Sequence, residues 1–308
     1  MSRPHKQKYL TEKNNIKLDH AEKYRVKEPS ELLTFLLNVS NKGRNAVKAL
    51  LSRGQVLVDD QVISQFNHQL KPNQMVTIIK DTVARNLNFS GLQILYEDND
   101  LIIIDKQSGL LSIASPKEKQ LTAYRQLSDY VRSKNRNNRI FIVHRLDKDT
   151  SGVMVFAKSE KMKVELQSDW KKVVKERSYM ALVEGELSKQ AGKVESWLKE
   201  NSMHKMYSTT EQHGAKKAVT HYQTIQSNGQ FSLLELKLET GRKNQIRVHM
   251  SDLGHPVVGD KKYGATSNPI NRLGLHAKKL VFTHPNTGKL LQFESNTPQL
   301  FFTKSKPD

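Results

Sequence analysis

The sequence predicts an α+β fold, because strand patterns dominate it and do not alternate regularly with helical patterns. Helical spacing of apolar residues is found chiefly at about 120–134 and 160–172. Runs of apolar and β-branched residues bounded by turn residues indicate strands at 94–96, 101–104, 141–143, 153–157, 179–183, 233–238, 246–250 and 280–282. We therefore expect a mixed, mainly antiparallel sheet flanked by helices and loops.

Length and charge narrow the class of protein. The chain has 308 residues, which suggests about two domains, and carries 50 Lys and Arg against 31 Asp and Glu, a net charge of +19. Such an excess indicates a polyanionic partner. We expect no signal peptide and no membrane span, since no apolar run approaches the roughly 20 residues that a span needs. The absence of Cys excludes disulfides, thiolate metal sites and a Cys nucleophile, and it suits a reducing cytoplasm.

The N-terminal part divides into a tail, a small domain and a linker. Residues 1–27 are polar and Lys-rich, which predicts a flexible basic tail. In 28–80, two stretches with helical spacing precede short strand patterns. The second helical stretch is basic and has no acidic residue among its charges, which are Lys42, Arg44, Lys48 and Arg53. A polar linker at 81–91 leads into a larger domain at 92–308.

The segment 30–80 resembles the small alpha-L RNA-binding domain, which is also found in a small-subunit ribosomal protein. The resemblance implies an αα-β domain whose basic helix contacts structured RNA. The simpler interpretation is a solvated helix face, which is how most charge runs behave.

The loop around Asp147 is the first candidate site. His144-Arg145-Leu146-Asp147 follows an apolar strand pattern, and the next strand pattern begins soon after Gly152. Reactive groups tend to lie in loops held by rigid strands. An Asp placed there could be a nucleophile, a base, a metal ligand or a turn cap, and by itself the turn cap is the better explanation.

Two strand patterns supply possible partners. In 244–250, period-2 alternation puts Gln245, Arg247 and His249 on one face and apolar residues on the other, so Arg247 is the candidate partner for a catalytic carboxylate. A solvated face is the default explanation for such a strand. In 179–183, Tyr179 shares a face with Ala181 and Val183, either as a core tyrosine or as a stacking platform for an extruded base.

The run from His144 to Gly152 resembles the signature of the RluA/RluD family of pseudouridine synthases. Further family motifs follow in the family's order between about residues 92 and 302, at 94–98, 109–111, 179–183, 241–249, 259–264 and 275–285. The resemblance implies that Asp147 is the catalytic residue, that Tyr179 stacks on the target base and that Arg247 pairs with Asp147. The residues expected to bind substrate are Arg145, which helps displace the uridine, Leu275, which lines the pocket, and His144.

Two positions depart from the family pattern. Asp105-Lys106-Gln107 stands where the family usually has Asn-Lys-Pro, and Asn244 stands where it often has His. We expect both departures to affect loop shape and RNA preference and not the chemistry.

The resemblance implies isomerisation of uridine to pseudouridine at an RNA-binding cleft, with no cofactor and no metal. We expect a cytoplasmic monomer that acts on RNA. The expected target is large-subunit ribosomal RNA, and transfer RNA is the alternative. One rival function is a non-catalytic RNA-binding or ribosome-maturation factor on the same scaffold. A second rival, an Asp-dependent phosphotransferase or metal-dependent hydrolase, is disfavoured because the sequence has no phosphate loop and no ligand cluster.

Overall fold

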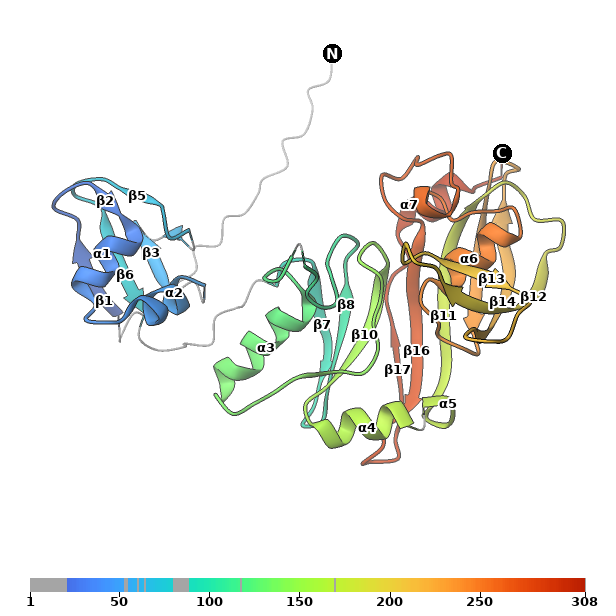
Figure 1. Ribbon diagram of the computed structural model, residues 1–308, viewed down its shortest axis with the longest axis horizontal. Coiled ribbons are helices and arrows are strands. Elements are labelled where there is room, and N and C mark those ends of the chain that lie inside the picture. Colours follow the sequence, from blue (N-terminus) through green and yellow to red (C-terminus); the bar gives the residue numbers. More distant parts are fainter. Residues whose placement is uncertain are drawn as a thin grey trace, which may run out of the picture. The chain divides into compact units, whose positions relative to one another are not determined.

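The computed structural model describes residues 21–52, 55–59, 61–63, 65–79, 89–116, 118–168 and 170–307. The chain forms two compact units, Met1–Asn86 and Leu87–Asp308 (Figure 1). Most of the predicted tail, Arg53 and most of the predicted linker lie outside the described residues.

The first unit packs two short helices on a small sheet. Its elements are β1 (Ala21–Arg25), β2 (Ser30–Glu31), α1 (Leu32–Val39), α2 (Arg44–Ser52), β3 (Val56–Val58), β4 (Gln61–Val62), β5 (Gln69–Leu70) and β6 (Met75–Ile79). Four strands pair in the order β1-β6-β3-β4, and β2 pairs with β5. Apolar residues of both helices, such as Leu36 and Val47, are fully buried against Val76 and Ile78 of β6.

Strand β1 corrects the predicted tail at its C-terminal end. Residues Ala21–Arg25 pair antiparallel with Met75–Ile79, although they belong to the flexible tail predicted for 1–27. The strand is mostly charged, as edge strands commonly are, and Tyr24 packs on the core of the unit. The polar sequence of β1 does not by itself predict a strand, and the strand forms because its backbone pairs with β6.

The second unit contains the remaining elements. Its strands are β7 (Leu92–Glu97), β8 (Leu101–Lys106), β9 (Phe141–Ile142), β10 (Ser151–Ala157), β11 (Val174–Glu184), β12 (Ala191–Glu200), β13 (Met206–Thr209), β14 (Lys216–Ser227), β15 (Phe231–Leu238), β16 (Leu275–Thr283) and β17 (Leu290–Glu294). Its helices are α3 (Ala123–Lys134), α4 (Glu160–Ser168), α5 (Trp170–Val173), α6 (Gln245–Asp252), the short 3₁₀ helix η1 (Lys261–Tyr263) and α7 (Gln299–Lys304).

All these strands form one 11-stranded sheet with the order β13-β12-β14-β15-β11-β16-β10-β8-β7, while β17 pairs with β16 and β9 with β10. Among the described strands only β10 and β16 pair in parallel. The predicted α+β class with a mixed, mainly antiparallel sheet is therefore confirmed.

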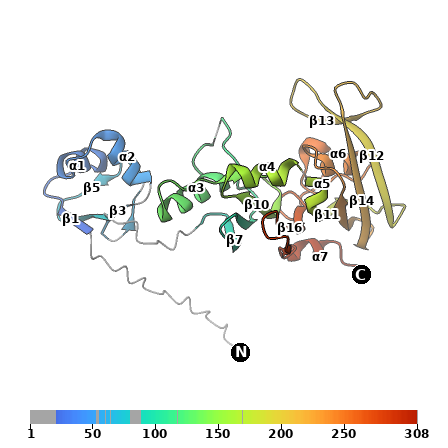
Figure 2. The same ribbon diagram turned by 90° about the horizontal axis from the view of Figure 1, so that it is seen from below.

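Helices cover both faces of this sheet (Figures 1 and 2). In the half built from β7, β8 and β10, α3 packs on one face and α4 on the other. In the half built from β14, β15 and β11, α6 packs on one face and α7 on the other. Tyr179 of β11 packs against both the α3 core and the α6 core, so it lies where the two halves meet.

The two halves join at the parallel contact of β10 and β16, where Gly152 lies opposite Ala277. Gly152 has a φ of +112°, and a Cβ at this position would lie 2.1 Å from the carbonyl oxygen of Ala277. Only glycine fits this approach of two backbones. The loop that carries Asp147 enters β10 immediately before this junction, so the fold places the loop at the middle of the sheet.

Candidate active site around Asp147

The residues on either side of Asp147 are fixed by the last residue of β8 and by the segment that follows this strand. The Ser112 hydroxyl donates to the Leu146 carbonyl oxygen at 2.6 Å, and the Leu146 N–H donates back to Ser112 Oγ at 3.2 Å. The Lys148 carbonyl oxygen accepts from Lys106 Nζ at 2.9 Å. The backbone is therefore held on both sides of a carboxylate whose side chain is 35% exposed.

Lys106 is the buried anchor of this arrangement. Its ammonium group donates to the carbonyl oxygens of Gln107, Leu110 and Lys148 at 3.0, 2.7 and 2.9 Å, and the residue has no exposed surface. Burial lowers the pKa of Lys106 to about 8, an effect that the charge of Asp149 partly offsets. Three carbonyl oxygens match the three donors of an ammonium group, so Lys106 ties the loop after β8 to the Asp147 loop.

The carboxylate of Asp147 is held through one oxygen. Oδ2 accepts from Arg247 Nη1 at 3.0 Å and from Asn244 Nδ2 at 2.6 Å. Arg247 is therefore the partner of Asp147, as the family resemblance implies. Arg145, the neighbour in sequence, is exposed, and its side chain makes no hydrogen bond or ion pair with the described residues.

Arg247 is in turn fixed by Asp260. Its Nε and Nη2 donate to Asp260 Oδ2 and Oδ1 at 2.6 and 2.8 Å, a two-pronged pairing that sets both the position and the plane of the guanidinium. The Asp260 side chain is 1% exposed, and the guanidinium carbon lies 4.9 Å from the Tyr263 ring centre. Burial by itself would lower the pKa of Arg247, but Asp260 and then Asp147 raise it above the ordinary value.

The strand predicted around Arg247 is wrong. Residues Gln245–Asp252 form helix α6, not a strand. Ile246 and Met250 pack in the core under β11 and β15, while Val248 packs in a separate cluster with Tyr263. A short helix that is buried on most sides shows no distinctive period, so its apolar residues can mimic strand alternation.

Tyr179 and Leu275 lie in one core cluster, as neighbouring strands β11 and β16 would place them. Ala181 and Val183 belong to the same cluster, which agrees with the face predicted for Tyr179. Burial raises the pKa of Tyr179, and the charge of Asp147 raises it further. The Tyr179 hydroxyl makes no hydrogen bond within the described part of the chain, so the ring is held by packing alone.

His144 turns to the protein interior. Its Nε2 accepts the backbone N–H of Val155 at 3.2 Å, and its ring lies 5.4 Å from the ring of Trp170. Burial, together with the charge of Arg177, lowers the pKa of His144 to about 3, so the ring is neutral at physiological pH. These contacts anchor the loop, whereas the sequence predicted that His144 binds substrate.

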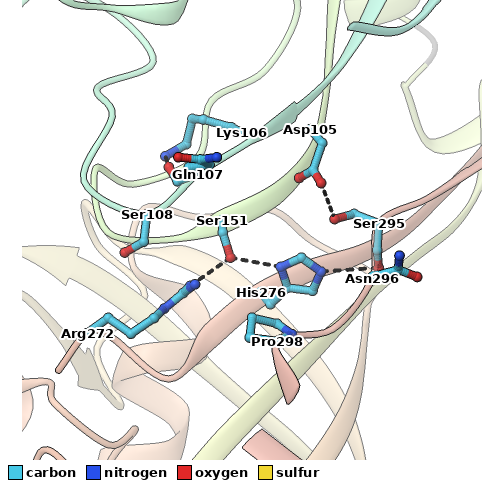
Figure 3. Close-up of a pocket in the computed structure, with 10 residues that line it drawn as sticks. All are labelled: Asp105, Lys106, Gln107, Ser108, Ser151, Arg272, His276, Ser295, Asn296 and Pro298. Carbon is cyan, nitrogen blue, oxygen red and sulfur yellow. Dashed lines mark hydrogen bonds between the residues drawn. The ribbon is translucent and has the colours of Figure 1, made fainter. Parts of the chain in front are cut away.

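A second hydrogen-bond network lies at the junction of β10 and β16 and lines a cavity of about 340 Å³ (Figure 3). Arg272 donates to Ser151 Oγ at 2.7 Å, and Ser151 Oγ lies 2.8 Å from His276 Nδ1. His276 Nε2 reaches the Ser295 carbonyl oxygen at 3.2 Å, and the Ser295 hydroxyl donates to Asp105 at 2.8 Å. The network fixes Ser151, where β10 begins after the Asp147 loop.

Three residues of the site were not assigned a role from the sequence. Asp260 and Tyr263 lie in motifs of the family resemblance, which was the available signal. Asn244 was noted only as a departure from the family pattern that we did not expect to affect the chemistry, yet its amide donates directly to the Asp147 carboxylate.

In the first unit, Lys42, Arg44 and Lys48 are exposed on or next to α2. Lys48 Nζ lies 6.0 Å from the ring centre of Phe66, which is 55% exposed. Arg53, the fourth predicted RNA contact, lies outside the described residues.

In the described residues no three His, Asp or Glu side chains are grouped so that they could hold a metal ion. None of the helices in the described parts of the chain has the length and apolar character needed to cross a membrane.

Comparisons with known proteins identify the family. A family model described as RNA pseudouridylate synthase matches residues 100–252. The uncharacterized RNA pseudouridine synthase YhcT of Bacillus subtilis is 32% identical over 284 residues, which cover 86% of this chain and 94% of that protein. The ribosomal large subunit pseudouridine synthase D of Nitrosomonas europaea is 38% identical over 216 residues, which cover 67% of this chain and 62% of that protein.

A solved structure shows the same relationship. Human RNA pseudouridylate synthase domain containing 4 superposes with a TM-score of 0.57 and 26% identity, covering 70% of this chain and 94% of that chain. Since a relative more than 30% identical is matched over nearly its whole length, the family is shown. The chain belongs to the RluA/RluD family of RNA pseudouridine synthases, which are isomerases.

Proposed function

We propose that this protein isomerises uridines in structured RNA with Asp147 as its catalytic residue. The observation that carries the proposal is the fixation of this one carboxylate. Its backbone is clamped on both sides, its Oδ2 is paired with Arg247, and its side chain still reaches solvent. Such a fixed, accessible carboxylate is what nucleophilic or acid–base catalysis requires.

The reaction breaks the bond between uracil N1 and ribose C1′, turns the base and forms a bond between C5 and C1′. C5 loses a hydrogen and N1 gains one, so the RNA keeps its composition. Asp147 assists cleavage either by attacking the ribose as a nucleophile or by removing a ribose proton.

The neighbouring residues suit the steps that surround cleavage. The detached uracil has to be retained while it turns, and we assign this to the face of Tyr179 and to the apolar side chain of Leu275. Arg247 orients Asp147 and balances its charge. We assign to Arg145, which is exposed beside Asp147, the displacement of the target uridine, and to His144, which contacts the Val155 backbone, the support of the loop.

We propose large-subunit ribosomal RNA as the target class, with transfer RNA as the alternative. One of the relatives is named as a ribosomal large subunit pseudouridine synthase. The first unit presents exposed Lys42, Arg44 and Lys48, which suit sequence-independent contacts to the phosphates of folded RNA.

The test uses the full-length protein and total RNA from cells that lack its gene. Pseudouridines are mapped by chemical labelling after incubation with the wild-type protein or with Asp147→Asn. We expect one or more new pseudouridines with the wild-type protein, in the large-subunit ribosomal RNA, and none with Asp147→Asn. RNA binding, measured by gel shift, should be retained, because the change only removes one negative charge from a protein whose net charge is already +19.

Asp129→Asn is the matched control. The Asp129 side chain is 42% exposed and pairs with Arg125 at 3.1 Å, much as Asp147 is 35% exposed and pairs with an Arg at 3.0 Å. This variant should modify RNA like the wild type. Activity retained in Asp147→Asn would refute the catalytic assignment, and new pseudouridines confined to transfer RNA would refute the target class.

A further inference from the structure

Asn244 bridges the Asp147 carboxylate and the 3₁₀ helix η1. Its Nδ2 donates to Asp147 Oδ2 at 2.6 Å, and its Oδ1 accepts from the Tyr263 hydroxyl at 3.2 Å. The Tyr263 hydroxyl oxygen accepts the backbone N–H of Met206 at 3.2 Å, so its own hydrogen is directed to Asn244. This chain of hydrogen bonds decides which end of the amide faces Asp147, because only the oxygen of Asn244 can accept from Tyr263.

The backbone of Asn244 restricts which residues can stand there. Asn244 precedes α6 with a φ of +52° and a ψ of 20°, the left-handed conformation. Apart from glycine, Asn, Asp and His are the residues enriched in this region. Of these, only Asn provides an N–H donor and an acceptor in a group that does not titrate.

Both donors to Asp147 bind the same oxygen. Arg247 Nη1 and Asn244 Nδ2 both reach Oδ2, and Oδ1 accepts no hydrogen bond from any residue that the structure describes. Two donors on Oδ2 leave Oδ1 as the oxygen with free lone pairs. An amide donor also strengthens this hold without adding a second titrating group beside the carboxylate.

We propose that Asn244 is a positioning residue which, with Arg247, fixes Oδ2 of Asp147 so that Oδ1 is the oxygen that reacts with the ribose. The proposal rests on the catalytic role of Asp147 proposed above. It gives a specific function to a position at which this chain departs from the family pattern.

Three variants of the full-length protein test this proposal. The substrate is an RNA with a mapped target uridine that carries tritium at C5, and the release of tritium measures the rate of the reaction. Asn244→Gly keeps the left-handed backbone and deletes the amide. A hydrogen bond to a charged group is lost, so kcat should fall by roughly 10- to 100-fold with KM nearly unchanged. Asn244→His, which tolerates the same backbone and offers an N–H, should recover most of this loss.

Asn244→Asp tests the pH dependence of kcat, which should not change if Asn244 has only a structural role. It retains shape and backbone but places a second carboxylate against Oδ2, and neighbouring carboxylates hold a proton up to a higher pH. The acidic limb of the kcat profile should therefore shift to higher pH by about one unit or more. The other titrating groups that interact with Asp147, namely Arg247, Lys106, Tyr179 and Tyr263, are the same in both proteins.

Asn271→Gly is the matched control, because Asn271 has a φ of +54° in the same unit and an exposed side chain. It should match the wild type in kcat and in melting temperature. If Asp147→Asn is inactive but Asn244→Gly equals Asn271→Gly, or Asn244→Asp leaves the pH profile in place, the inference is overturned while the proposed function stands. Activity in Asp147→Asn would overturn both.

Discussion

Replacing Asp260 with asparagine should loosen the guanidinium that aligns Asp147. Asp260 accepts two hydrogen bonds from Arg247, and the two side chains are largely buried, with 1% and 15% of their surface exposed. In Asp260→Asn, the new amide would turn an N–H group towards a guanidinium that can only donate. One of the two hydrogen bonds would therefore be replaced by a repulsive contact between donors.

The size of the effect follows from burial. Removing one partner of a buried ion pair destabilises a protein by about 3–5 kcal/mol, because the remaining charge stays buried without compensation. The amide keeps one acceptor and Arg247 keeps Asp147, so we expect a loss near the lower limit, about 3 kcal/mol. Because Arg247 would then be free to tilt, the alignment of Asp147 should suffer and kcat should fall roughly 10- to 100-fold.

Urea unfolding followed by tryptophan fluorescence measures the stability of the second unit, because both Trp residues, Trp170 and Trp197, lie in Leu87–Asp308. Activity is then compared at a temperature where both proteins are fully folded. The control Asp129→Asn breaks only an exposed pair and should change the unfolding free energy by about 0.5 kcal/mol or less. Equal stability and equal kcat in Asp260→Asn and the wild type would refute the view that Asp260 fixes the catalytic pair.

Two further predictions concern stability. Gly152→Ala should destabilise the protein by more than about 3 kcal/mol, because its Cβ would meet the Ala277 carbonyl oxygen at 2.1 Å. Gly229→Ala, where φ is also positive but no atom lies within 4 Å of the new Cβ, should cost about 1–2 kcal/mol in the same urea assay. Burial lowers the pKa of His249 from 6.5 to about 4, so between these values the unfolded chain binds a proton that the folded chain does not. The unfolding free energy should therefore fall as the pH is lowered through this window, by up to about 1.4 kcal/mol per unit from this residue. His249→Gln should remove this part of the slope and leave the contributions of the other groups whose pKa is lowered, among them His144 and His276.

Much of the site was predictable because its signals are local. The strands on both sides of the Asp147 loop, the face shared by Tyr179 and Ala181, and the basic helix of the first unit all follow from short patterns of residue type. A strand with a buried face has to alternate, and a loop between two strands has to be polar, so these features are written in adjacent residues.

The features that escaped prediction are those in which packing outweighs local preference. Strand β1 is charged and exists through its pairing with β6. The segment around Arg247 alternates like a strand but folds as α6, because nearly every side of it is covered. The pattern of a buried helix carries little information about its period.

The sequence by itself determined the fold class, the polyanionic partner and, through its long signature, the identity of Asp147 as the acid of interest. The tertiary structure alone decided how that acid is held. Arg247 and Asn244 lie about a hundred residues further along the chain, and the fold brings them to the same carboxylate oxygen. Such contacts depend on a left-handed residue, a buried helix and a clamped loop at once, and no stretch of neighbouring residues specifies all three.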